Sequence, residues 1–541
     1  MTRIIATTFA ALLIIHLPQT ASGYLVANVL SLDELQTESE VIFKGTVVTT
    51  GPIEDESFES VHGFEPYQTV FEIVSVIKGD IKSDTVRFRH YGESDGAPMR
   101  MYMPQHYSFQ LDRTYIVCAK KSDAPNQFRQ LWDHHRSKED QGVLLAHDIQ
   151  PHSGRKLTEI YWHELQGLLQ GDDAADTSYA IEQLGALTGI GHGSHTSLDR
   201  VMVVDAIANL IDSPDDEIAQ QAIRAIGQEN PTMGGNIWAL IRLNPAHFPG
   251  HGTLEKPDAN KSAQRHQAKL IQMAQSDRSP TVRALAILSL ADTQSPVLRM
   301  LAQKWASDDS SSVRAAAAIL LADYADNLPI DVWQKLMSDQ SNTVRVDTIR
   351  AIGIGQVSGM IPMLSELLSD DDPKVVSSAA ASLLSFSIDD TRSIMQRQTD
   401  HGEFGCVFVN ALATENVALY TSQLGHIIRT DPHPKQWWGG HVPWGVAWNL
   451  LFIHVQKQPQ TKIRSGEMDM LLDYLESPIT AFEKSNHYSS SEPRDLYALY
   501  IQRGLRRRAK EYRMRVNQKT SYDMDLYFDR VDAHPDHFLR N

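Results

Sequence analysis

The chain has 541 residues and carries 67 acidic against 50 basic side chains, a formal net charge of −17 at pH 7. This balance disfavours a nucleic-acid partner, because phosphate binding needs a basic face. The two cysteines, Cys118 and Cys406, exclude a disulfide-rich framework. The favoured interpretation is that both are buried thiols, and the alternative is a long-range disulfide bond between them.

The N-terminal segment has the order of a secretory signal. Arg3 is followed by an apolar run over 4–17 and by small residues over 19–23. A positive charge, an apolar core and small residues in this order are typical of a cleaved signal peptide. The run is shorter than the roughly 20 apolar residues of a membrane-spanning helix. We therefore predict a signal peptide over 1–23 and an exported protein, periplasmic or extracellular, with no membrane span.

Four short segments rich in β-branched and aromatic residues come next and are separated by turn-rich stretches. This composition predicts strands of a small β-domain. The predicted strands are 41–48, 68–77, 84–89 and 113–119. We place the domain at 24–172, closed by a helix near 157–169.

Two details of these strands carry a resemblance. Lys44-Gly45 lies in the first strand, and Lys78-Gly79 follows the second, before a late Tyr-Ile-Val strand. This order is similar to the OB barrels of the netrin-like and metalloproteinase-inhibitor-like group. Inhibitors of that group chelate the zinc of a protease with an N-terminal Cys, whereas this mature chain would begin at Tyr24. The resemblance therefore implies a small barrel for binding or docking, without the inhibitory mechanism.

A repeated unit follows at a constant interval of 31 residues. Each copy has a Ser-Asp pair and a Val five positions after the Asp, and three copies have an Arg after the Val. The aligned acids are Asp277, Asp308, Asp339 and Asp370. A fixed period of about 20–50 residues predicts a solenoid whose units bury their apolar faces by stacking.

Each unit is predicted to contain two helices. Capping residues open the first helix, in two copies directly before a Pro. The capping positions are Ser279, Ser310, Ser341 and Asp372. Apolar residues such as Val344 and Ile352 then recur at helical spacing. Gly353 or a loop residue is expected to turn the chain into the second helix.

The second helices show apolar columns with polar residues between them. One core column holds Ala302, Trp333 and Leu364, and another holds Trp305, Leu336 and Leu367. A helix of 3.6 residues per turn places the intervening polar residues on the opposite face. These are our candidate partner-binding residues: Gln303, Lys304, Gln334, Lys335, Ser365 and Glu366.

Two helices per unit, with Asp and Val-Arg at these offsets, resemble the short HEAT repeats first noted in phycobilin lyases. The resemblance covers 277–400, and a degenerate copy at 215–227 extends it upstream, before a Pro- and Gly-rich insert at 229–262. In this family the arginine usually pairs with an acid of a neighbouring repeat, which implies structural roles for Arg283, Arg314 and Arg345. The predicted fold class is α+β and multidomain, a small OB-like β-barrel followed by an all-α armadillo-type superhelix over 173–400.

The last part, 401–541, is predicted to be a helical capping region. Four tryptophans crowd there at Trp437, Trp438, Trp444 and Trp448. Core packing is the favoured interpretation, and a glycan platform or an interface hot spot is the alternative. The basic cluster at 503–515 is predicted to be a solvated helix paired with acids elsewhere.

Two pairs of histidines were considered as zinc ligands: His192 with His195, and His247 with His251 in the insert. Neither pair has the spacing of a known zinc motif. Nucleophile-elbow, phosphate-loop and dinucleotide motifs are absent from the sequence. We therefore predict no catalytic residue, no cofactor and no metal.

These patterns favour an exported, non-catalytic scaffold that binds a protein or peptide through the solenoid surface. The first alternative is an enzyme, either a metal-dependent hydrolase that uses the His-rich insert or, by analogy with the phycobilin proteins, a lyase. The second alternative is a carbohydrate-binding protein that uses the tryptophan cluster. The identity of the partner and the oligomeric state stay open.

Overall fold

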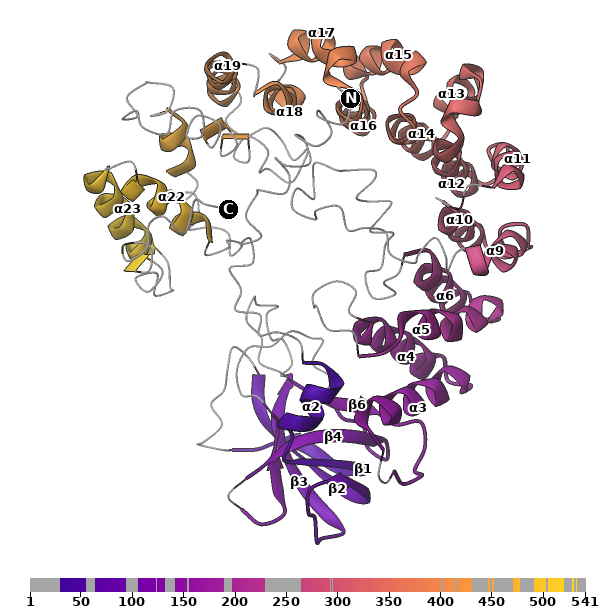
Figure 1. Ribbon diagram of the computed structural model, residues 1–541, viewed down its shortest axis with the longest axis vertical. Coiled ribbons are helices and arrows are strands. Elements are labelled where there is room, and N and C mark those ends of the chain that lie inside the picture. Colours follow the sequence, from indigo (N-terminus) through magenta and orange to yellow (C-terminus); the bar gives the residue numbers. More distant parts are fainter. Residues whose placement is uncertain are drawn as a thin grey trace, which may run out of the picture. The chain divides into compact units, whose positions relative to one another are not determined.

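The computed structural model (Figure 1) describes most of the β-domain and of the repeats. The described residues are 30–54, 64–93, 106–122, 124–131, 142–152, 155–188, 197–228, 264–291, 293, 295–399, 402–413, 416–430, 446–447, 450–451, 470–476, 491–502, 505–519, 528–529 and 532. The signal peptide, the insert and the tryptophan cluster lie outside these ranges. Among the helices inside them, none has the length and apolarity needed to cross a membrane.

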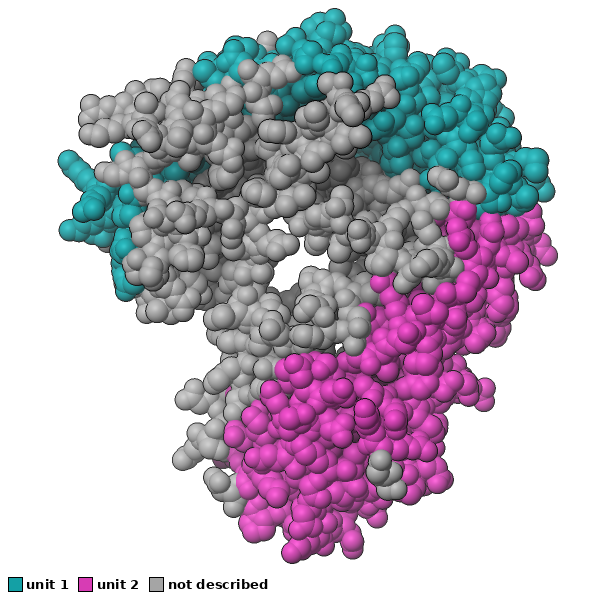
Figure 2. Space-filling view, viewed as in Figure 1, with its two compact units in different colours: residues 1–24, 239–254, 294–541 teal, residues 25–238, 255–293 magenta. Residues whose placement is uncertain are grey.

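The chain divides into two compact units, coloured separately in Figure 2. One unit comprises 25–238 and 255–293, and the other comprises 1–24, 239–254 and 294–541. The first holds all the strands and the helices up to α10, and the second holds the helices from α11 onward. The domain boundaries expected from the sequence at 172 and 400 stay predictions.

Six strands make up one sheet, and all four predicted strands are among them. The strands are β1 (Val41–Pro52), β2 (Phe64–Lys78), β3 (Thr85–Glu93), β4 (Thr114–Lys121), β5 (Gln127–Arg129) and β6 (Val143–Leu145). β1 pairs antiparallel with both β2 and β4, β2 pairs with β3, and β3 runs parallel to β5, which pairs with β4. The successive pairings of β1, β2, β3, β5 and β4 return to β1, so these five strands form a closed cycle. β6 adds to β4.

Aromatic rings fill the core of the sheet. Phe71 packs edge-on against Phe43 at 5.5 Å and against Phe109 at 5.2 Å between ring centroids. Gly45 permits this packing, because a Cβ there would lie 3.0 Å from the Cβ of Phe71. Gly45, which pairs with Ile73 on β2, therefore allows a close approach of β1 to the side chain of Phe71.

Helices accompany the sheet and continue from it in the same unit. They are α2 (Leu32–Glu38), α3 (Leu157–Gln170), α4 (Ala174–Leu187), α5 (Arg200–Ile207), η1 (Ala208–Asp212), α6 (Asp216–Gln228), α9 (Gln267–Ala274) and α10 (Pro280–Ser289). Ser31 and Glu34 form a reciprocal capping box at the start of α2. α3 is the predicted closing helix, and α6 falls on the degenerate repeat.

The second unit is helical throughout its described part. Its helices are α11 (Pro296–Trp305), α12 (Ser311–Leu321), η4 (Ala322–Asn327), α13 (Ile330–Met337), α14 (Asn342–Ile354), η5 (Ser358–Met360), α15 (Ile361–Glu366), η6 (Leu367–Ser369), α16 (Pro373–Ser385), α17 (Ile388–Gln398), α18 (Gly402–Leu412), α19 (Val417–Thr430), α22 (Ser491–Gln502) and α23 (Arg506–Lys519). α14 lies against both α12 and α16, and α13 packs on α14. The prediction of two helices in each 31-residue repeat is confirmed here.

The first helices pack through small and branched side chains, as the repeat pattern predicts. Val313, Val344 and Ile352 are fully buried. Gly353 does not turn the chain, so that half of the expectation was wrong; loop residues directly after α14 make the turn, as the other half expected. It lies inside α14, where a Cβ would come within 2.8 Å of the backbone of Ser382 on α16. This Gly allows the two helices to approach closely.

The helix caps follow the predicted positions with one difference. Ser279 and Asp372 accept hydrogen bonds from the first turns of α10 and α16. Ser310 and Ser341 are N-cap residues, but their side chains make no capping bond. The repeat aspartates act instead, because Asp308 and Asp339 each accept from the backbone N–H two residues later, at 2.9 and 2.8 Å.

Candidate functional site

The six candidate partner-binding residues lie on α11, α13 and α15. Gln303, Lys304, Gln334, Lys335 and Glu366 are exposed, and Ser365 is half-buried. The core column beside them is buried at all three positions, Ala302, Trp333 and Leu364. Leu367 is only half-buried, and Leu368 takes its place in the core. That the six residues bind a partner stays a prediction.

The arginine after the repeat Val has a structural role at Arg314. Its Nε and Nη2 donate to the two carboxylate oxygens of Asp339 in the next unit, at 2.7 and 2.9 Å. Its Nη1 donates to the carbonyl of Asp308 at 2.8 Å. The hydrogen bond from Arg314 lowers the pKa of Asp339 below its ordinary value. Arg345 instead donates to the carbonyl of Asp339, at 3.0 Å.

The basic C-terminal cluster is paired with acids, as the sequence predicts. Arg508 bonds Glu476 and Asp473. Arg513 bonds Asp529 and Asp532, at 2.8 and 3.2 Å. Both arginines are therefore held in ion pairs, whereas Arg506 and Lys510 are exposed on α23.

A largely buried polar cluster lies against the middle of α3, in the unit that holds the sheet. We call it the Glu164 cluster, and its members are Lys44, His147, Asp148, His152 and Glu164. Lys44 comes from β1, Glu164 comes from α3, and the others come from the segment between β6 and α3. Lys44 and Glu164 have fully buried side chains.

Lys44 is the cationic centre of this cluster. Its Nζ donates to Glu164 Oε1 at 2.6 Å, to Asp148 Oδ1 at 2.8 Å and to the carbonyl of Gln150 at 2.9 Å. An ammonium has three donors, so this lysine is saturated. In the Lys44-Gly45 pair noted in the first strand, Lys44 therefore anchors the buried ion pairs. Gly45, the next residue, allows the close approach to Phe71 of β2.

Glu164 accepts on both of its oxygens. Oε1 lies 2.5 Å from His152 Nε2 in addition to Lys44, and Oε2 accepts the backbone N–H of His147 at 2.8 Å. Burial opposes ionisation of Glu164, but the hydrogen bonds from Lys44, His152 and His147 outweigh burial and lower the pKa of the carboxyl. Glu164 is therefore a carboxylate at neutral pH.

The ring of His147 lies between two carboxylates. Its Nδ1 is 2.6 Å from Glu164 Oε2, and its Nε2 is 3.1 Å from Asp148 Oδ2. Each ring nitrogen therefore has one carboxylate oxygen within hydrogen-bond distance. The ring fits here because Gly167 has no side chain: a Cβ at Gly167 would lie 2.3 Å from the ring carbons of His147.

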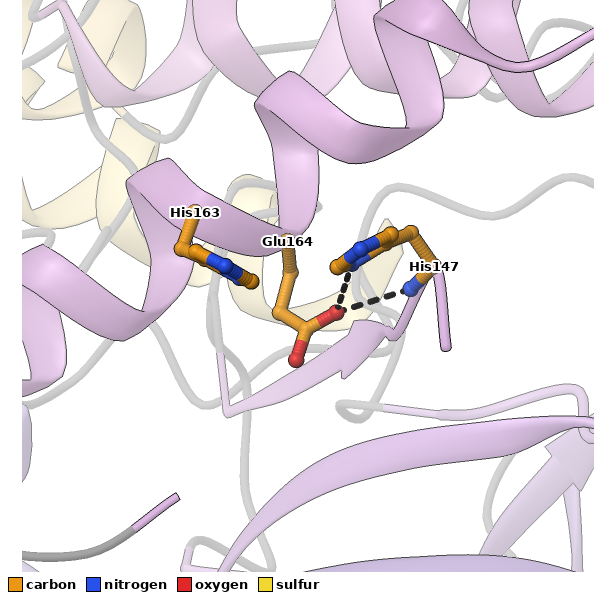
Figure 3. A group of neighbouring side chains, drawn as sticks. All are labelled: His147, His163 and Glu164. Atoms are coloured by element: carbon orange, nitrogen blue, oxygen red, sulfur yellow. Dashed lines mark hydrogen bonds and ion pairs between the residues drawn. The ribbon is translucent and has the colours of Figure 1, made fainter. Parts of the chain in front are cut away.

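A third imidazole, His163, borders the cluster. It precedes Glu164 on α3, is exposed, and its ring centroid lies 5.1 Å from that of His147 and 5.4 Å from that of His152. Figure 3 shows Glu164 between His147 and His163. One ligand atom from each of these three residues lies within 4.8 Å of the others, so the three could hold a metal ion.

The amino-acid pattern along the chain does not single out His147, His163 or Glu164. Its histidine pairs, His192 with His195 and His247 with His251, fall outside the described residues. The signal that could have found the cluster is an adjacent His163-Glu164 inside an amphipathic helix, one turn before Gly167. A Gly in the interior of a helix costs roughly 1 kcal/mol relative to Ala, so it indicates a close approach by another group.

The cysteines agree with the favoured interpretation. Cys118 and Cys406 are both buried, and neither takes part in a disulfide. The long-range bridge that the sequence left open is not formed.

Comparison with known proteins identifies the repeats. Residues 268–352 match the family model of HEAT repeats. No curated protein matches the chain.

Three solved structures illustrate the similarity of the fold. The Escherichia coli protein YibA is 18% identical over 56% of this chain and 98% of its own, with a TM-score of 0.30. A computationally designed armadillo repeat protein for modular peptide recognition is 17% identical over 41% and 98%, with a TM-score of 0.26. Kap121p is 10% identical over 68% and 45%, with a TM-score of 0.34. The match to the family model of HEAT repeats, over 268–352, lies inside the array expected from the sequence.

Proposed function

We propose that this chain is an exported, non-catalytic scaffold that binds a protein or peptide partner through α11, α13 and α15. The observation that carries the proposal is a recurring exposed Gln-Lys pair. Gln303 and Lys304 on α11 recur as Gln334 and Lys335 on α13, one repeat later, and all four are exposed. Surfaces that repeat at a fixed interval suit an extended ligand, because successive units of a solenoid offer equivalent contacts.

The chemistry of this surface indicates the kind of ligand. A Gln amide both donates and accepts, as a peptide backbone requires, and Lys attracts carboxylates. Apolar side chains lie on the same helices, since Val297 and Met300 on α11 are 51% and 61% exposed. Mixed apolar and polar contacts are typical of protein interfaces. We therefore expect an extended segment with acidic and apolar side chains.

The helices that carry these residues are firmly anchored. Trp305 on α11 is nearly fully buried, and Trp333 on α13 is fully buried. Large buried aromatics hold a helix in a defined position, which lowers the entropy cost of presenting its exposed side chains.

The β-domain provides a second contact in this proposal. The cycle of pairings through β1, β2, β3, β5 and β4 supports an OB-type barrel, in agreement with the resemblance found in the sequence. The order of residues over 1–23 supports export. No described residue favours the hydrolase of the His-rich insert or the carbohydrate site of the tryptophan cluster.

Site-specific photocrosslinking tests the proposal. A benzophenone amino acid is placed at Gln334 in the full chain, and the matched control carries it at Lys510, which is exposed on α23. We expect an adduct of one defined mass from Gln334 in the native extract and none from Lys510. Adducts of equal yield from both positions, or none from either, would contradict binding through this surface.

A further inference from the structure

We propose that His147, His163 and Glu164 form a binding site for a divalent transition metal, with zinc as the expected ion. The ligand atoms of the three residues lie within 4.8 Å of one another, where the middle of α3 meets the segment after β6 (Figure 3). Two imidazoles and one carboxylate are a donor set that suits zinc, and three protein ligands leave one position for another group. This site is separate from the partner-binding surface of α11, α13 and α15.

The first argument concerns charge. The Glu164 cluster contains two carboxylates, Asp148 and Glu164, and one lysine, Lys44, which contacts both of them. The lysine balances one of the two negative charges, and the other negative charge remains. That surplus surrounds the His147 ring, which is in contact with both carboxylates. Carboxylate oxygens on two sides of one imidazole favour a divalent cation at this point.

The second argument concerns the orientation of the ligands. His147 would bind the metal through Nδ1, since its Nε2 lies 3.1 Å from Asp148 Oδ2 and can donate there. A ligating His whose other ring nitrogen donates to a carboxylate is the arrangement that fixes the ring in zinc sites. Lys44 and His152 hold Oε1 of Glu164 and so leave Oε2 directed at His147.

The third argument concerns access and space. His163 is exposed, so an ion can reach the site from solvent. Gly167 leaves the room that the His147 ring occupies. Nδ1 of His147 and Oε2 of Glu164 are 2.6 Å apart, whereas two ligands of one tetrahedral zinc lie roughly 3.3 Å apart. Binding therefore replaces the hydrogen bond between these atoms and requires a small movement that separates them.

The test uses the full chain, freed of metal with a chelator and titrated with Zn²⁺ against a chromophoric competitor. Three proteins are compared: wild type, His163→Ala and His266→Ala. His266 is the matched control, because its Nε2 also faces a carboxylate, Asp205 Oδ1, at 2.9 Å. We expect the wild type and His266→Ala to bind one equivalent more than His163→Ala, or the same equivalent at least tenfold more tightly.

A second variant addresses the geometry without removing a ligand. Gly167→Ala improves the helix propensity of α3 but places a methyl group where the His147 ring lies. We expect this variant to keep its far-ultraviolet circular dichroism and to bind Zn²⁺ at least tenfold more weakly than the wild type.

Two results would overturn the proposal. One is equal zinc binding by the wild type, His163→Ala and Gly167→Ala, including no binding by any of them. The other is a zinc equivalent that disappears in His247→Ala/His251→Ala and persists in His163→Ala, which would assign the metal to the insert.

Discussion

Lys44 Nζ lies 2.6 Å from Glu164 Oε1, and both side chains are fully excluded from solvent. This pair ties β1 to α3 over 120 residues of sequence. A buried ion pair contributes little when both partners are compared with apolar residues, but the loss of one partner leaves an uncompensated charge. The replacement of one partner alone should therefore destabilise the unit that contains the sheet.

Replacing Lys44 with Met should destabilise the sheet-containing unit by about 3–5 kcal/mol, because Glu164 then stays buried without its cation. Denaturant unfolding followed by circular dichroism measures this change. The double variant Lys44→Met/Glu164→Leu should lose less than the sum of its two single variants. Lys82→Met is the control, since Lys82 and Asp80 form an exposed pair. A Lys44→Met protein as stable as Lys82→Met would refute the role of the buried pair.

His90 should make the same unit sensitive to acid. Burial lowers the pKa of His90 from 6.5 to about 4, while a backbone hydrogen bond to Tyr91 opposes the shift. The unfolded chain then binds a proton below pH 6.5 that the folded chain takes up only near pH 4. Stability should be highest above pH 6.5 and fall, by on the order of 3 kcal/mol from this group, as the pH drops to 4.

The measurement for His90 is the free energy of unfolding between pH 7 and 4 in the wild type and in His90→Gln. The difference between the two proteins removes the contribution of the other titrating groups. It should decrease steadily through this window. A difference that is independent of pH would show that His90 is not buried in its neutral form.

Arg314 should stabilise the repeats through Asp339. Its guanidinium makes a bidentate contact, and it also satisfies the carbonyl of Asp308. Arg314→Ala should cost about 1.5–3 kcal/mol, the range for hydrogen bonds to charged groups. In a double-mutant cycle with Asp339→Ala, the two losses should not add, because both variants remove the same contact. Additive losses would mean that the contact contributes nothing.

Val344 should tolerate no charge. Its side chain is fully buried on α14, so Val344→Asp should lower the free energy of unfolding by several kcal/mol. The same change at Val297, which is 51% exposed on α11, should have little effect. A thermal melt of Val344→Asp that overlays the wild type would contradict the register assigned to the repeats.

The repeats could be predicted from the sequence because their information is local. Val344 and Ile352 recur at helical spacing, and the same spacing returns one unit later. The four longer strands were predictable for a similar reason, since β-branched residues cluster in each. β5 and β6 have three residues each, too few to show a pattern.

The Glu164 cluster could not be predicted in the same way. Its residues come from β1, from the segment after β6 and from α3, so no spacing along the chain joins them. In the sequence, Lys44 has the character of an exposed strand residue. Its burial becomes evident only when β1 is paired with both β2 and β4. Gly353 shows the same limit, because its close contact with Ser382 exists only once α14 lies against α16.

The most direct test of the scaffold proposal is the affinity of the full chain for the protein crosslinked through Gln334. Lys304→Glu/Lys335→Glu is compared with Lys374→Glu/Lys510→Glu, which makes the same change of charge at exposed positions outside the proposed surface. We predict at least a tenfold loss of affinity in the first double variant and less than a twofold change in the second. Equal affinities in the two variants would contradict binding through α11 and α13.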